Sequence, residues 1–134
     1  MNVKHAYSRS EEILNASTHA VGLLMAIVVC RFFVVKSADY ASSLGILSLV
    51  IYFVGVASSY AASTMYHAIP AASVKRKALA RKVDHAAIYW HIAGSYSPIT
   101  LIAMRDVGYW GWGIFAFCWL CAIVGTSLSL YSLK

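Results

Sequence analysis

The stretch SLGILSLVIYFVGVASSYAASTMYH, residues 43–67, decides the fold of this chain. It contains no Asp, Glu, Lys or Arg, and its mostly apolar residues are interrupted only by small residues such as Ser, Thr and Gly. A run of roughly 20 such residues is long enough to cross the hydrocarbon core of a bilayer as an α-helix. We therefore predict a transmembrane helix over residues 43–66, with His67 at its end.

The rest of the chain has the same character. Of its 134 residues, 60% are hydrophobic and only 12% are charged, whereas about a quarter are charged in a soluble domain. The mean hydropathy of +0.68 agrees. Three further apolar runs predict spans near residues 15–35, 84–104 and 109–131. We expect an all-α, polytopic transmembrane helical bundle of four spans, forming one membrane domain over residues 1–134.

The basic residues predict the orientation of the bundle. One side carries Lys4, Arg9, Lys75, Arg76, Lys77, Arg81, Lys82 and Lys134. The other side carries Lys36 and Arg105, with Arg31 close by. Because Lys and Arg accumulate in cytoplasmic loops, we expect a cytoplasmic N-terminus in the cell's inner or plasma membrane. This asymmetry explains the net charge of +6, so we expect membrane lipids and no nucleic acid as partners.

Two polar residues stand at matching ends of neighbouring spans. His67 ends the span at residues 43–66, and Asp84 begins the next. Since consecutive spans run antiparallel, the two side chains should lie at the same face and depth. An imidazole beside a carboxylate at a membrane edge predicts a metal or hydrolytic site. Ser63, one turn before His67, shares its face of the helix.

The entry to the first span is also polar. Glu11, Asn15 and His19 are four residues apart and should line one helix face. Ser8 and Glu11 have the spacing of a capping box, which predicts that this helix begins in water before it enters the bilayer. Pro98 lies inside the third span and should bend it or leave a carbonyl free.

Structural explanations exist for each of these residues. A histidine at a helix end is often an interface residue without ligands. Asp84 would stabilise a helix N-terminus as a cap. Asn15 and Ser63 would serve as bridges between helices. These explanations weaken when several helices place polar groups at one depth, because polar residues in spans are costly.

Four separated motifs resemble the hemolysin III family, which is grouped with the progestin and adipoQ receptors and is related to alkaline ceramidases. They are Glu11-x-x-x-Asn15-x-x-Thr18-His19-x-x-Gly22, Ser63-x-x-Tyr66-His67, Asp84-His85 and Gly94-Ser95-Tyr96-x-Pro98. The resemblance covers nearly the whole chain. It implies a fold of about seven spans, of which this chain would hold four.

The resemblance also implies a zinc site. His67 would bind the metal, Asp84 would hold the zinc-bound water, and Ser63 would belong to the same site. Glu11, Asn15 and His19 match a family motif to which we assign no role. The family's last span supplies two more histidines as HxxxH, a pattern that this sequence lacks. We therefore expect a C-terminally truncated product, a fragment or a shortened relative, with an incomplete zinc site.

For the full-length form, the resemblance implies a zinc-dependent hydrolase of lipid amides, similar to a ceramidase, with a membrane lipid as substrate. Two other classes compete with it. The first is a non-enzymatic membrane protein, either pore-forming and cytolytic or a sensor of membrane lipids. The second is a receptor, for which the sequence shows neither a ligand pocket nor a signalling domain.

Overall fold

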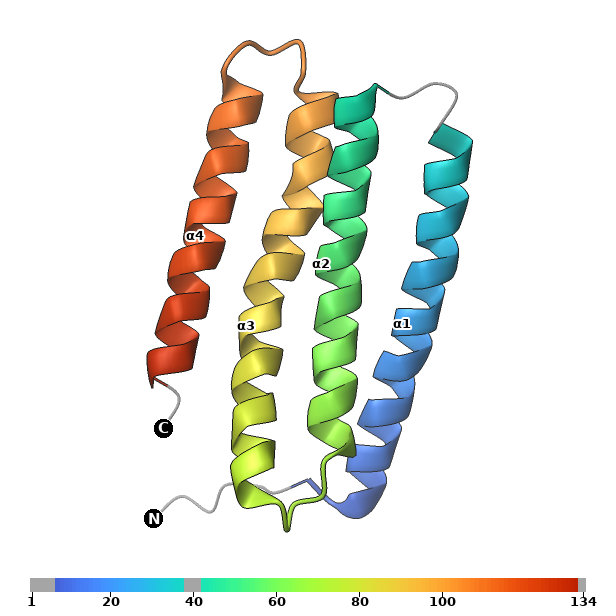
Figure 1. The fold of residues 1–134 in the computed structure, drawn as a ribbon, viewed down its shortest axis with the longest axis vertical. Helices are drawn as coiled ribbons and strands as arrows, with labels where there is room; N and C mark the ends of the chain where they lie inside the picture. Colours follow the sequence, from blue (N-terminus) through green and yellow to red (C-terminus); the bar gives the residue numbers. More distant parts are fainter. Residues whose placement is uncertain (1–6, 38–41, 133–134) are drawn as a thin grey trace.

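The computed structural model describes residues 7–37 and 42–132. Within these residues the fold is all-α, as predicted (Figure 1). The elements are α1 (Arg9–Ser37), α2 (Ser43–Ala68), α3 (Val74–Pro98), the π-helical segment η1 (Ile99–Ala103) and α4 (Trp110–Ser132). Lys4 and Lys134, which contributed to the predicted charge asymmetry, lie outside the described residues.

The helices form a bundle in which neighbours in the sequence are neighbours in space. α1 packs on α2, α2 on α3, and α3 on α4, and Figure 1 shows them in a row with alternating direction. The C-terminal end of α2 therefore lies at the same end of the bundle as the beginnings of α1 and α3. This topology brings the polar residues of three helices together.

α1, α2 and α4 are long and apolar enough to cross a membrane, so the chain is a multi-pass membrane protein. α3 does not meet this criterion within the described residues. The reason is that charged residues extend beyond the first turn of the helix, which starts at Val74. They are Lys75, Arg76, Lys77, Arg81, Lys82 and Asp84. The apolar residues that follow are divided between the rest of α3 and η1, which continues directly from it.

The beginning of α3 corrects the expectation that this helix starts near Asp84. The apolar run marks only the part of the helix that suits lipid, while Lys, Arg and Ala before it are also good helix formers. Asp84 is consequently an interior residue of α3. The explanation of Asp84 as a helix cap is wrong.

The capping box at the beginning of α1 is confirmed. The backbone N–H of Ser8 donates to a Glu11 carboxylate oxygen at 2.7 Å, and the Glu11 N–H donates to the Ser8 hydroxyl at 3.3 Å. This reciprocal pairing satisfies two backbone donors that a helix N-terminus leaves free. α1 therefore begins at Arg9, before the apolar run.

Pro98 is the last residue of α3, and the helix widens into η1 directly after it. Proline has no N–H to donate to the preceding turn. The Met104 N–H donates to the Ile99 carbonyl, five residues earlier, at 3.0 Å, which is the π-helical pattern. Two further carbonyls, those of Tyr96 and Ser97, accept the Thr100 hydroxyl at 2.8 and 3.2 Å.

α2 and α3 approach each other through facing glycines. A Cβ atom added to Gly55 would lie 2.8 Å from the Trp90 carbonyl oxygen, and one added to Gly94 would lie 3.2 Å from the Ile51 carbonyl oxygen. Small residues allow this close backbone contact. In lipid the hydrophobic effect does not drive helices together, so association depends on such packing. On the other side of α3, the Trp90 indole N–H donates to the Thr126 hydroxyl of α4 at 2.9 Å.

We expect Gly55→Ala to destabilise the protein by about 1–3 kcal/mol, because the new methyl group would force backbone atoms of α2 and α3 apart. Gly113→Ala is a matched control, since a Cβ atom at Gly113 would meet nothing within 4 Å. Thermal unfolding in mild detergent, followed by circular dichroism, should give a lower Tm for Gly55→Ala only. Equal Tm values for the two variants would contradict the close contact.

Candidate functional site at the ends of α1, α2 and α3

The site lies where α2 ends. His67 is the penultimate residue of α2, and a short turn leads to the beginning of α3 at Val74. The Ile69 N–H donates to the Met65 carbonyl and closes the last turn of α2. The first turn of α1 lies beside this end, so Glu12 reaches across to both neighbouring helices.

Glu12 is the central residue of this cluster. One of its carboxylate oxygens, Oε2, lies 2.7 Å from Nδ1 of His67, and the other, Oε1, lies 2.8 Å from Nζ of Lys77. The side chains of Glu12 and His67 are only 18% and 9% exposed. The pairs are therefore largely shielded from water, so their Coulomb attraction is screened less than that of surface pairs.

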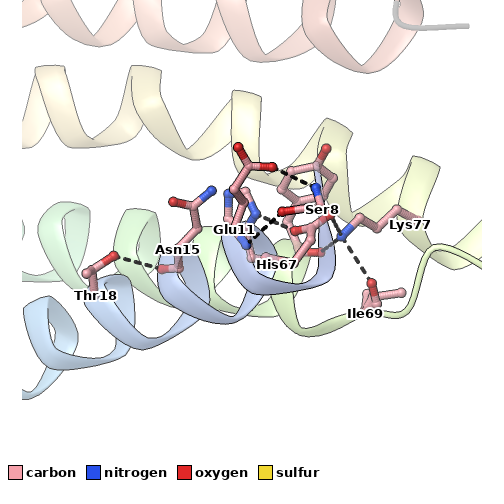
Figure 2. Close-up of polar contacts among 9 residues, drawn as sticks. Ser8, Glu11, Asn15, Thr18, His67, Ile69 and Lys77 are labelled. Carbon is pink, nitrogen blue, oxygen red and sulfur yellow. Dashed lines mark hydrogen bonds and ion pairs between the residues drawn. The ribbon is translucent and has the colours of Figure 1, made fainter. Parts of the chain in front are cut away.

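Lys77 joins the beginning of α3 to the end of α2. Its ammonium group donates to the carbonyl oxygens of Tyr66 at 2.8 Å and Ile69 at 3.0 Å, in addition to its contact with Glu12. Figure 2 shows Lys77 reaching Ile69 next to His67. An ammonium group has three donors, and here each has an acceptor. Lys77 also lies over the ring of Tyr66, 4.5 Å from its centroid.

Aromatic rings surround the His67 imidazole. His19 of α1 stacks on it with an interplanar angle of 8° and 5.9 Å between ring centroids. Tyr7 and Tyr66 meet it edge-on, at 5.6 and 4.7 Å. The imidazole is thus held in one plane by neighbours from two helices and the segment before α1.

A cavity of about 680 Å³ opens beside this cluster, and both His67 and Asp84 line it. Its other lining residues are Tyr7, Glu12, Tyr66, Ala71, Val74, Lys77, Ala78, Arg81 and His85. Within the described part of the chain, Asp84 makes no hydrogen bond or ion pair with another residue. The cavity therefore offers one imidazole held by neighbours and one carboxylate that no described residue pairs with.

The other residues predicted from the sequence occupy different surroundings. Ser63 is buried in α2 and, in the described structure, does not line the cavity. Glu11 is exposed and is occupied by the capping box with Ser8. Asn15 is half-buried, and its carbonyl accepts the Thr18 hydroxyl at 3.0 Å. Of the three residues predicted at the entry to α1, only His19 contacts His67.

The sequence interpretation missed Glu12 and the role of Lys77. Glu12, Asn15 and His19 are spaced by three and four residues, which also places them on one helix face. Glu11 had a second explanation in the capping box, and that explanation is the one the structure supports. The spacing of Glu12 from Asn15 and His19 was therefore the sequence feature that could have identified it.

The described residues do not fit a zinc ion by themselves. Among residues 7–37 and 42–132, no group of three or more His, Cys, Asp or Glu side chains lies close enough to hold a metal ion, whereas zinc sites in proteins use at least three such ligands. In addition, Nδ1 of His67 already faces Glu12.

Comparisons with known proteins agree with the motifs. A family model described as Haemolysin-III related matches residues 7–134. The chain is similar to the Hemolysin-3 homolog of Bacillus subtilis (strain 168), with 33% identity over 128 residues, covering 96% of this chain and 58% of that protein. It is also similar to Hemolysin-3 of Bacillus cereus, with 32% identity over 124 residues, covering 92% of this chain and 55% of that protein.

The chain thus spans little more than half the length of these curated relatives. No solved structure matches it. Because the family match includes all the residues of the cluster and the cavity, and nearly the whole sequence, the chain belongs to the Haemolysin-III related family.

Proposed function

We propose that this chain forms part of a membrane-embedded hydrolase of lipid amides, similar to a ceramidase, which is completed in a protein of the relatives' full length. The observation that supports it most is the cavity shared by His67 and Asp84. A partly enclosed cavity at the end of membrane helices suits a lipid substrate. Its hydrocarbon chains would remain in the bilayer while its amide group reaches the polar residues.

In this proposal the residues of the chain have separate roles. Lys77 and Glu12 hold His67 in place. Asp84 is the candidate general base, because its carboxylate lines the same cavity and has no partner among the described residues. Ser63, buried one turn before His67, would support the helix end rather than touch the substrate.

Zinc belongs to the proposal for the complete protein, as the family resemblance implies. His67 would be one ligand, and the remaining ligands would come from residues outside this chain.

In the second candidate function, favoured by the name hemolysin that both relatives carry, the protein forms a lytic pore. The deeply buried hydroxyls argue against a water-lined path, since Ser48 and Ser97 donate to carbonyls of their own helices at 2.7 and 3.0 Å.

We further propose that the N-terminus and the turn between α2 and α3 are cytoplasmic, because the basic residues concentrate at that end. Single cysteines test this at Ala72, in the turn between α2 and α3, and at Val107, in the turn before α4, in a background without Cys30, Cys118 and Cys121. Both positions are exposed, and the two turns lie at opposite ends of the bundle (Figure 1). In intact cells, an impermeant maleimide should label Val107→Cys, and it should label Ala72→Cys only after permeabilisation. The reverse pattern would invert the proposed orientation.

The purified chain of 134 residues should hold well below one zinc ion per molecule in mild detergent, because its described residues bring too few donors together. Elemental analysis measures this directly. His67→Ala and the control His85→Ala should both leave the low zinc content unchanged. About one zinc ion per chain, lost in His67→Ala and kept in His85→Ala, would show that these helices complete a site of their own.

In a protein of the relatives' full length that carries this chain, Asp84→Asn should lower the rate of ceramide hydrolysis by about 100-fold or more, the usual contribution of a general base. The matched control is Asp106→Asn, in the exposed turn at the other end of the bundle. Release of fatty acid in mixed micelles is the measurement. Equal rates for the two variants would remove Asp84 from the reaction, and bilayer conductance without hydrolysis would favour the pore.

A further inference from the structure

The two oxygens of the Glu12 carboxylate have different partners. Oε1 lies 2.8 Å from Nζ of Lys77, and Oε2 lies 2.7 Å from Nδ1 of His67. Lys77 carries a positive charge and can only donate, and the carboxylate beside it can only accept. In the contact between His67 and Glu12, Nδ1 of His67 must therefore be the donor.

From this geometry we propose that Glu12 is a positioning residue, which holds His67 with Nδ1 protonated and leaves Nε2 as the nitrogen with a free lone pair. A neutral imidazole has one donor and one acceptor nitrogen, so fixing the first determines the second. The use of Nε2 by a reacting group rests on the proposed function. The assignment of the proton to Nδ1 does not depend on it.

The surroundings favour a fixed imidazole over a mobile ion pair. Lys77 is held by the carbonyl oxygens of Tyr66 and Ile69 as well as by Glu12, so its charge stays beside the carboxylate. The stacked His19 ring restricts rotation of the His67 ring. Within the described residues, Nδ1 is the only ring nitrogen of His67 with a hydrogen-bond partner.

Replacing Glu12 by Gln gives a specific expectation. An amide has one oxygen and one NH₂ group, and Lys77 requires the oxygen. The NH₂ group would then face His67, and Nδ1 would have to accept. Glu12→Gln should thus reverse the tautomer, so that Nε2 carries the proton. A loss of rigidity alone would instead leave both tautomers populated.

Glu11→Gln is the matched control. Glu11 is the adjacent residue in the same helical turn, but its carboxylate contacts the Ser8 N–H and not His67. The substitution changes the net charge by the same amount. An effect of charge on the whole helix end would appear in both variants, whereas the proposed contact predicts an effect in Glu12→Gln only.

The test is ¹⁵N NMR of the 134-residue chain, labelled at histidine and held in detergent micelles above the pH at which free imidazole is charged. Protonated and bare ring nitrogens give well-separated shifts, and His67→Asn identifies the signals of His67 among the five histidines. We expect protonated Nδ1 and bare Nε2 in the unaltered chain and in Glu11→Gln, and bare Nδ1 and protonated Nε2 in Glu12→Gln.

Bare Nδ1 in the unaltered chain, or protons on both of its ring nitrogens, would overturn the proposal without any variant, so the test does not depend on the folding of Glu12→Gln. An unchanged tautomer in Glu12→Gln, a mixture of tautomers there, or equal changes in Glu11→Gln would also overturn it. If these signals behave as expected while the full-length protein cleaves no ceramide, the positioning role stands and the proposed hydrolase function falls.

Discussion

The ammonium group of Lys77 is the interaction on which the candidate site depends. It comes from the first turn of α3, accepts no hydrogen bond, and donates to two carbonyls at the end of α2 and to a carboxylate of α1. The end of a helix leaves several carbonyls without partners and carries partial negative charge. One cation thus satisfies carbonyls beside His67 and fixes the Glu12 carboxylate that His67 contacts.

The fold was largely predictable because lipid imposes a simple rule. Backbone groups in hydrocarbon must pair within their own segment, so a long apolar run can be assigned as a helix from its sequence. The runs at residues 15–35 and 43–66 fall inside α1 and α2, and the run at 109–131 begins one residue before α4. The beginning of α3 was missed because its first turns lie in a basic segment, where composition marks the membrane boundary and not the helix boundary.

The candidate site was predictable in part. Antiparallel spans were enough to place His67 and Asp84 at one end, and both line the same cavity. The choice between Glu11 and Glu12 was not decided by periodicity, because residues three and four apart both share a helix face. It was decided by geometry, since the Glu11 carboxylate turns back to the Ser8 N–H while the Glu12 carboxylate reaches His67. The π-helical turn after Pro98 had no signal beyond the proline itself.

The weakly apolar character of α3 has a consequence for biosynthesis. A segment that begins with several charged residues gains little free energy by entering lipid alone. α3 is, however, flanked by α2 and α4 (Figure 1), and glycines bring its backbone into close contact with that of α2. We expect the translocon to release α2 and α3 as a helical hairpin, so that the second helix is shielded by the first while its charged beginning stays outside the hydrocarbon.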